Sequence, residues 1–306
     1  MGWRKTGFCL QTSLIIYFEV HYLLLIFTKT NIPGLKRLLN IAVVLVCLAA
    51  CIFSVRTIVR ALWTVSFHIL SDSMEPTILP GDYICAWRLK DNAPIGHNDV
   101  IFFSFPYEGA WDSICSPLGR YYVKRCIALP GDTLRIEKGR FSVTGYDGAL
   151  GNVEAQNDLA ARLAGVTEDS VARRMGICLD AWPQNDSLSW TVLDFGPLFV
   201  PCSGSRVAMD RSSFQMYRNY IEWEQGLPLT VDEKGVVSLG DSPIDSYTFH
   251  KDYYFVAGDK ADNSRDSRYW GLLPRDHIAA KAWIIKKSVD PVSGKWRYGR
   301  IGKKVE

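Results

Sequence analysis

The sequence predicts a mainly β fold: a curled antiparallel sheet with an inserted second subdomain, preceded by one or two transmembrane helices. After Ser73, short apolar runs alternate with turn signals, which is the pattern of an all-β domain. Residues 38–55 form an apolar run without a charge. Residues 141–250 differ from both flanks, because they are first rich in Ala, Asp, Glu and Arg and then dense in Trp, Pro, Gly and Ser.

With 306 residues, the chain is long enough for one large domain or two modest ones. Its mean hydropathy of 0.00 fits a globular domain that carries one or two membrane segments. We expect six segments: residues 1–37 (an apolar segment and a cytoplasmic loop), 38–55 (a transmembrane anchor), 56–140 (the first part of the core), 141–250 (the inserted subdomain), 251–290 (the second part of the core) and 291–306 (a basic, solvated tail).

The apolar run 38–55 is predicted to cross a membrane. It contains a single polar amide, Asn40, and at a rise of about 1.5 Å per residue it covers about 27 Å, close to the thickness of the hydrocarbon core. Lys36 and Arg37 precede it directly. The positive-inside rule therefore predicts that the preceding loop is cytoplasmic and that the chain after Val55 faces outward.

An earlier stretch, residues 7–27, is also apolar but contains Gln11, Glu19 and His21. A charged Glu at bilayer depth costs a few kcal/mol on insertion scales. The sequence leaves open whether this stretch spans the membrane. The expected orientation of the main domain is the same in either case.

Short apolar runs bounded by turn residues predict the strands of the core. We expect them at residues 83–87, 100–103, 121–123, 133–136, 254–257 and 279–285. The peptide Leu-Pro-Gly-Asp occurs at 79–82 and again at 129–132, and its central Pro and Gly favour a type II turn. Residues 57–70 are expected to enter the core, with an apron on the membrane surface as the alternative. A helix is expected within residues 150–175.

Charge and cysteine usage exclude several classes of protein. Lys and Arg number 35 against 32 Asp and Glu, without a dense basic patch, so nucleic-acid binding is not expected. None of the 8 cysteines forms a CxxC pair and the 5 histidines are scattered, so we expect no metal site and no cofactor. Cys178 and Cys202 lie in a loop-rich stretch, and both a disulfide and two free thiols remain open.

Ser73 and Lys124 are the candidate nucleophile and base. A serine hydroxyl needs a base, yet no Gly-x-Ser-x-Gly elbow occurs and His68 lies inside an apolar stretch. A lysine serves as base when burial without a counter-charge lowers its pKa. Lys124 lies in a predicted strand, whose alternation points Arg125 to the opposite face, so that one of the two is buried and the other solvated. Since no Ser-x-x-Lys occurs, the β-lactamase arrangement is excluded.

Four motifs follow the anchor in a fixed order: Ser73–Thr77 (Ser-Met-Glu-Pro-Thr), a turn that ends in Gly-Asp, Tyr122–Arg125 (Tyr-Val-Lys-Arg), and Gly258–Gly271, which ends in Asp-Ser-Arg-Tyr-Trp-Gly. In these motifs and their order, which cover most of the chain, the sequence resembles the bacterial signal peptidase I family. That family consists of membrane-bound serine proteases that remove signal peptides. Its fold is a curled β-sheet core with a variable inserted domain.

The resemblance implies a role for six residues. Ser73 is the nucleophile, and Lys124 is the general base that later returns the proton to the leaving amine. The Ser71 hydroxyl joins the Ser73 N–H in the oxyanion hole. Three further residues shape the site: Ser264 orients the lysine amine, and Asp266 and Arg268 form a buried ion pair.

The sequence departs from the family pattern beside the nucleophile and in the closing motif. Asp72 stands where a small residue, often Gly, is usual. If the segment is extended, the side chains of Asp72 and Ser73 point apart, and the sequence leaves open whether Asp72 tunes the site or merely faces water. Lys260 and Ala261 stand where Asn and Arg are frequent.

The resemblance implies a membrane-anchored endopeptidase that cleaves N-terminal signal peptides from translocated preproteins, with small residues, typically Ala, at the first and third positions before the cut. Its partners would be signal peptides and the lipid bilayer, and we expect a monomer. The catalytic domain would lie on the extracytoplasmic side of the cell membrane. The alternatives are a related Ser/Lys protease with a narrow substrate range and a non-catalytic, membrane-anchored scaffold on the same fold.

Overall fold

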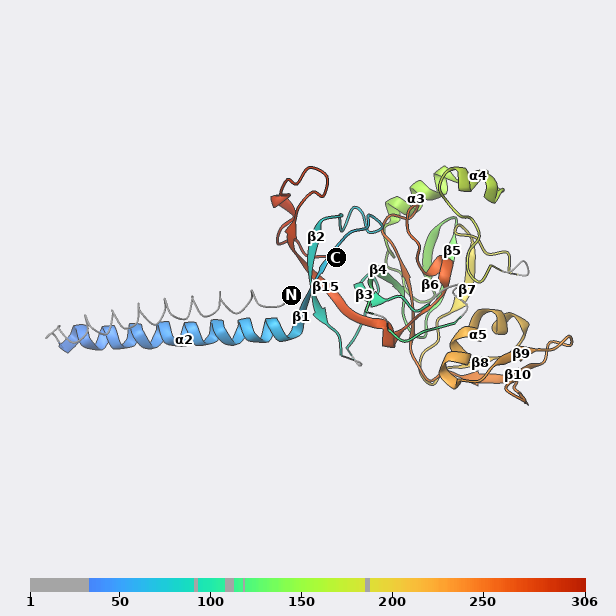
Figure 1. Cartoon of the computed structure of the whole chain (residues 1–306), viewed down its shortest axis with the longest axis horizontal. Helices are drawn as coiled ribbons and strands as arrows, with labels where there is room; N and C mark the ends of the chain where they lie inside the picture. Colours follow the sequence, from blue (N-terminus) through green and yellow to red (C-terminus); the bar gives the residue numbers. More distant parts are fainter. Residues whose placement is uncertain (1–32, 91–92, 108–112, 118, 185–187) are drawn as a thin grey trace. The chain divides into compact units, whose positions relative to one another are not determined.

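The computed structural model describes residues 33–90, 93–107, 113–117, 119–184 and 188–306. The chain divides into two compact units, Met1–Trp63 and Thr64–Glu306. In the first unit the structure describes the helix α2, Pro33–Trp63 (Figure 1). The predicted apolar stretch 7–27 lies outside the described residues.

Helix α2 contains the predicted anchor. Within it, Asn40–Ile58 has a mean hydropathy of 2.5 and is long and apolar enough to cross a membrane. The helix continues past the predicted end of the anchor to Trp63. The expectation that residues 57–70 belong to the core is therefore wrong for their first half, because no Gly or Pro interrupts this stretch and the helix propagates through it. Only Thr64–His68 form the entry strand, β1.

A seven-stranded sheet forms the centre of the second unit, with the strand order β1-β2-β15-β3-β4-β13-β14 (Figure 1). Every neighbouring pair is antiparallel. The strands are β1 (Thr64–His68), β2 (Asp82–Arg88), β3 (Val100–Ser104), β4 (Tyr121–Ala128), β13 (Tyr253–Ala257), β14 (Leu273–Pro274) and β15 (Ile278–Ser288). The predicted mainly β, antiparallel fold is confirmed, and each strand expected for this sheet overlaps an observed one.

Both Leu-Pro-Gly-Asp peptides form turns in which the glycine has positive φ, 88° at Gly81 and 93° at Gly131. In each turn the aspartate carboxylate accepts a hydrogen bond from the N–H of the leucine, at 2.9 Å for Leu79 and 2.7 Å for Leu129. Gly81 is fixed for a second reason. A Cβ at this position would lie 1.9 Å from the carbonyl oxygen of Val289.

Between β4 and β13 the chain forms three smaller sheets and three helices. The sheets join β6 (Arg140–Val143), β5 (Thr133–Glu137) and β7 (Phe195–Phe199); β11 (Ser242–Pro243), β10 (Val237–Leu239) and β9 (Leu229–Val231); and β12 (Ser246–Thr248) with β8 (Arg206–Ala208). The helices are α3 (Val153–Arg162), α4 (Asp169–Arg174) and α5 (Arg211–Gln225). The helix expected within residues 150–175 is thus two short helices.

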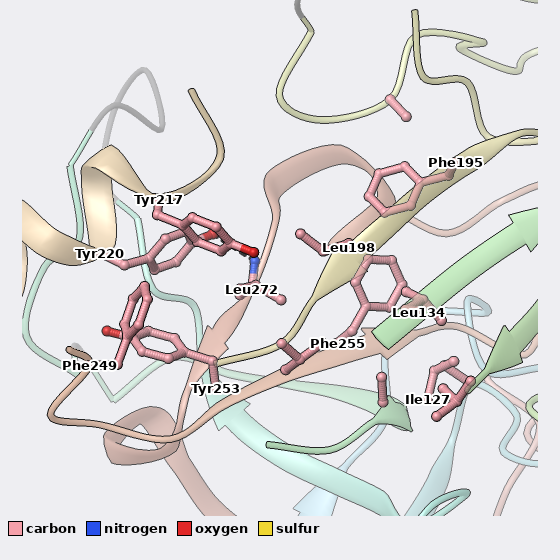
Figure 2. Packing of buried hydrophobic residues seen from close by; sticks show 14 of the residues in the cluster. Ile127, Leu134, Phe195, Leu198, Tyr217, Tyr220, Phe249, Tyr253, Phe255 and Leu272 are labelled. Atoms are coloured by element: carbon pink, nitrogen blue, oxygen red, sulfur yellow. Dashed lines mark hydrogen bonds between the residues drawn. The ribbon is translucent and has the colours of Figure 1, made fainter. Parts of the chain in front are cut away.

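One hydrophobic cluster joins this intervening region to the seven-stranded sheet (Figure 2). Leu134 and Phe195 of the smaller sheet pack with Phe255 of β13, and Tyr217 of α5 belongs to the same cluster. The Leu272 N–H donates a hydrogen bond to the hydroxyl of Tyr220, at 2.7 Å. Residues 141–250 therefore share their core with the sheet.

The C-terminal residues fold back on β15. Lys304 pairs with Ile284 in an isolated bridge, and Val305 is buried in the cluster formed by β2, β3 and β15. Most of residues 291–306 are exposed, as expected for a solvated tail, but Val305, the last residue but one, is an exception because this apolar side chain is buried on the sheet.

Substitution of Phe255 by Ala should lower the free energy of unfolding by about 3–5 kcal/mol, because it empties a fully buried position in the shared cluster. The measurement is equilibrium chemical denaturation. Val292→Ala is the matched control, since that side chain is 95% exposed and its removal should change stability by less than about 0.5 kcal/mol. Equal effects of both variants would contradict the assignment of this core.

Candidate functional site

The loop between β1 and β2, residues 69–81, carries Ser73 and is called the Ser73 loop here. Met74 and Ile78 are fully buried in the cluster that also contains Ile84 of β2 and Ile285 of β15. Apolar anchors on the C-terminal side of Ser73 thus hold the loop on the sheet. Ser73 itself is only 8% exposed.

Lys124 reaches Ser73 from the middle of β4. Its Nζ lies 2.6 Å from the Ser73 Oγ, at hydrogen-bond distance, and the residue is 5% exposed. Burial lowers the pKa of Lys124 to about 8. Asp266 opposes this shift, Arg268 reinforces it, and Asp259 and Asp72 oppose it more weakly. A substantial fraction of the Lys124 amine is therefore neutral near pH 8, and the Ser73 hydroxyl lies within reach as a proton donor to it.

The neighbouring Arg125 is buried as well, so the expectation that one of the pair is solvated is wrong. Arg125 points away from Lys124, as strand alternation predicts, but its guanidinium meets the carboxylate of Asp259 through two bonds, of 2.7 and 2.6 Å. It also donates to the carbonyl oxygen of Asn98, at 2.8 Å. A bidentate partner and a carbonyl compensate for the loss of water. The sequence analysis did not predict the Arg125–Asp259 ion pair. The only local sign of it is that Asp259 belongs to the Gly-Asp that opens the closing motif.

The segment after β13, residues 258–266, brings two of the expected residues, Ser264 and Asp266, to the site and is called the closing loop here. At its end, Asp266 caps helix α6 (Ser267–Trp270) and forms two bonds with the guanidinium of Arg268, of 2.8 and 2.9 Å. Neither residue is more than 2% exposed. Burial by itself would raise the pKa of Asp266, but the adjacent Arg268 outweighs it and the pKa is lowered.

Ser264 is buried beside this ion pair. Its hydroxyl lies close enough to Asp266 to lower the pKa of that carboxyl, although it makes no well-formed hydrogen bond within the described part of the chain. No hydrogen bond joins it to Lys124 among the described residues. Gly258 lies directly against it: a Cβ at Gly258 would be 2.2 Å from the Ser264 Oγ and 2.5 Å from the Ser73 carbonyl oxygen. Gly258 is thus required by close approach, and sequence reasoning did not single it out.

Ser71 lies two residues before Ser73 and is exposed. The Ser73 N–H donates a hydrogen bond to its hydroxyl, at 3.2 Å. The two donors expected to form an oxyanion hole are therefore adjacent.

Asp72 does not simply face water. Lys260 of the closing loop binds its carboxylate at 2.5 Å, and the Asn263 amide donates to both of its oxygens, at 3.1 and 2.9 Å. Lys260 foremost lowers the pKa of Asp72. Of the two alternatives that the sequence leaves open, the structure excludes a carboxylate that merely faces water, because the side chain is about one-third exposed and held by two partners.

A groove of about 400 Å³ opens beside Ser73 and Lys124. Its walls come from Phe67–Ser73 on one side and Tyr121–Lys124 on the other, with Asn263 and Arg265 at the rim. Phe67 and Tyr121 are in edge-to-face contact, with ring centroids 5.3 Å apart. The apolar walls fit the side chains of an extended peptide.

One group of side chains in the described part of the chain has the spacing of metal ligands. Asp169, Cys178 and Asp180 bring ligand atoms within 4.8 Å of one another. The carboxylate of Asp169 is already occupied by Arg173 and by the Leu179 N–H. Cys178 and Cys202 are both free thiols.

The chain is similar to known proteins over most of its length. The model of the family described as signal peptidase, peptidase S26, matches residues 36–286. A signal peptidase I from Buchnera aphidicola (subspecies Baizongia pistaciae) is 26% identical over 263 residues, which cover 80% of this chain and 78% of that protein. A signal peptidase I from Aquifex aeolicus is 28% identical over 225 residues, covering 72% and 74%. The match to a crystal structure of a signal peptidase I from Enterococcus faecalis covers 62% of this chain and 97% of the crystallised chain, with 18% sequence identity and a TM-score of 0.26.

Replacement of Asp266 by Ala should lower the free energy of unfolding by about 3–5 kcal/mol, because Arg268 would be left buried without its counter-charge. Chemical denaturation measures the change. The control is Lys251→Met, which breaks the partly exposed pair with Asp276 and should cost less than about 1 kcal/mol. If Asp266→Ala were as stable as Lys251→Met, the ion pair would not be structural.

Proposed function

We propose that this chain cleaves signal peptides as a serine peptidase, with Ser73 as the nucleophile and Lys124 as the general base. The chain belongs to the family described as signal peptidase, peptidase S26. The observation that carries the proposal is the 2.6 Å distance between Lys124 Nζ and Ser73 Oγ in a buried environment. Burial favours the neutral amine, which is the form that accepts a proton.

In the first half of the reaction, the Ser73 Oγ attacks the carbonyl carbon of the scissile peptide bond while Lys124 accepts its proton. The tetrahedral intermediate then collapses. The C–N bond breaks, the leaving amine takes the proton from the Lys124 ammonium, and the signal peptide remains as an ester on Ser73. In the second half, Lys124 takes a proton from a water that attacks this ester. The bond between the acyl carbon and the Ser73 Oγ then breaks, the Lys124 ammonium returns the proton to the Oγ, and the signal peptide leaves with a new carboxylate.

The developing oxyanion needs donors. The Ser73 N–H and the Ser71 hydroxyl are the candidates, and their mutual hydrogen bond of 3.2 Å keeps them adjacent before substrate arrives. On attack, the carbonyl oxygen would replace this bond and accept from both. One such donor typically contributes about 10²–10³ in rate.

The substrate would lie in the groove between β1 and β4. The expected preference for small side chains fits walls built from large apolar residues such as Phe67 and Tyr121. Phe67 of β1 also stacks on Phe102 of β3, with ring centroids 3.9 Å apart. Since β2 and β15 lie between these two strands in the sheet, a contact of this length supports a sheet that curls and brings β1 back toward β3.

The membrane part of the proposal has the apolar window Asn40–Ile58 as anchor. The positive-inside rule, applied to Lys36 and Arg37, supports a catalytic unit on the extracytoplasmic face of the cell membrane. We propose that the partners are signal peptides of translocated preproteins and the bilayer, and that the enzyme acts as a monomer.

Ser73→Ala and Lys124→Met should each lower kcat for cleavage of a preprotein in detergent by on the order of 10⁴-fold, because the nucleophile or its base is lost. Gel-based cleavage rates give the measurement, and unchanged circular dichroism verifies folding. The control is Ser66→Ala, which alters an exposed serine of β1. Wild-type activity in Lys124→Met would rule out the dyad.

The pH dependence follows from the lowered pKa of Lys124. The ammonium form is inactive, so kcat/KM should rise tenfold per pH unit below about 8 and level off above it. Initial rates between pH 6 and 10 on a peptide without ionisable groups near the cut would report this profile. A flat profile, or a rise centred near the ordinary lysine value of 10.5, would contradict the assignment.

Gly258→Ala should reduce kcat by on the order of 10²-fold and lower the free energy of unfolding by about 1–3 kcal/mol, because the added methyl group must displace the buried Ser264 side chain and the Ser73 carbonyl. Gly299→Ala is the matched control, since no atom lies within 4 Å of a Cβ at that position. Full activity in Gly258→Ala would mean that this contact is not part of the site.

A further inference from the structure

Two departures from the family pattern noted in the sequence, at Asp72 and Lys260, meet in space. The Lys260 Nζ lies 2.5 Å from the Asp72 Oδ2, although the two residues are 188 positions apart in the chain. One carries a negative charge directly before the nucleophile, and the other carries the positive charge that offsets it. The two departures are therefore complementary rather than independent.

Lys260 holds the Ser73 loop at three points. Its ammonium binds the carboxylates of Asp72 and of Glu75, the latter at 3.1 Å. Its backbone N–H donates to the carbonyl oxygen of Ser73, at 3.1 Å. The residue before the nucleophile, the nucleophile and the residue two positions after it are thus all tied to a single lysine of the closing loop.

Asn263 completes this arrangement by donating to both oxygens of Asp72. The same closing loop contributes Gly258, which lies against the Ser73 carbonyl, and Ser264, which is buried next to Asp266. The contacts of Asp72 therefore connect the Ser73 loop to the closing loop, which is in turn fixed to β4, the strand of Lys124, by the bonds between Arg125 and Asp259.

The charge of Asp72 also matters for the chemistry. A carboxylate next to the position where negative charge develops would oppose formation of the oxyanion. Lys260 binds Asp72 more closely than it binds Glu75, at 2.5 Å against 3.1 Å, so it offsets mainly the charge of Asp72, and the three groups together carry one negative charge. Lys260 thus removes the electrostatic disadvantage of Asp72 and retains the positional benefit of its hydrogen bonds.

From these contacts we propose that the Asp72–Lys260 ion pair, supported by Asn263, is a clamp that positions the Ser73 loop for attack and offsets the negative charge beside the oxyanion. The inference rests on the proposed role of Ser73. Both partners are positioning residues, since their contacts act through the Ser73 backbone.

The test is a double-mutant cycle on the full-length enzyme in detergent, with Asp72→Asn, Lys260→Met and the combination of the two. Lys260→Met leaves Asp72 charged and unpaired, so kcat should fall at least tenfold while KM changes less than twofold. Asp72→Asn keeps an acceptor for Asn263 and should cost less. The double variant should be more active than Lys260→Met, because the charge next to Ser73 is gone and only the Glu75 carboxylate has lost its partner. Lys260→Arg keeps the positive charge beside Asp72, so this variant should retain most of the wild-type activity.

The pH profile provides a second readout. Four charged residues act on the Lys124 amine: Asp266, Arg268, Asp259 and Asp72. Asp72 raises the pKa of Lys124, so Asp72→Asn should move the inflection of kcat/KM to lower pH. A contribution to stability alone would not move it. Unfolding midpoints of all variants verify that the proteins are folded.

Lys251→Met is the matched control, because Lys251 and Asp276 form a partly exposed pair of the same 2.5 Å length with no contact to the site. If Lys260→Met retains kcat as Lys251→Met does, while Ser73→Ala is inactive, the clamp is wrong and the proposed function stands. If Ser73→Ala cleaves like the wild type, the proposed function itself fails. If the two single effects simply add, Asp72 and Lys260 act separately, and the clamp is again wrong.

Discussion

The burial of the Lys124 amine beside the Ser73 hydroxyl is the constraint on which the site depends. A lysine exposed to water would be an ammonium ion at neutral pH and would have no lone pair to offer. Burial lowers the pKa of Lys124 to about 8, but the nearby carboxylate of Asp266 works in the opposite direction. Arg268 reduces that opposition by binding both oxygens of Asp266. The buried ion pair is therefore linked to the protonation state of the lysine.

The closing loop carries much of this arrangement. It begins at Gly258 and Asp259, directly after β13, and ends at Asp266, the cap of α6. At both ends it is fixed by a buried arginine, with Arg125 bound to Asp259 and Arg268 bound to Asp266. Bidentate arginine–carboxylate pairs with further hydrogen bonds can persist inside a protein, although the loss of either partner is costly. The loop that supports Ser73 is therefore held by directional contacts rather than by apolar packing alone.

Much of the fold could be predicted from local patterns. Five strands of the seven-stranded sheet (β2, β3, β4, β13 and β15) could be predicted because each is a short apolar run bounded by turn residues, whereas the two-residue β14 was not predicted. Both Leu-Pro-Gly-Asp turns follow from the conformations that Pro and Gly favour. The end of helix α2 at Trp63 was not predicted, because the sequence has no Gly or Pro there to stop the helix. The pairing of β1 with β2 decides where the helix ends and the strand begins. Val305 was missed because nothing local shows that a chain end packs on a sheet.

By itself, the sequence determined the order of the elements, the apolar window of the anchor and the residue types available for chemistry, because these depend on composition and short-range spacing. Tertiary structure alone decided which side chains meet. The Lys124–Ser73 contact joins residues 51 positions apart, Arg125–Asp259 joins residues 134 apart, and Lys260–Asp72 joins residues 188 apart. Burial of Arg125, pairing of Asp72 and the pKa of Lys124 all depend on such distant neighbours, whose charges and exclusion of water have no trace in the local sequence.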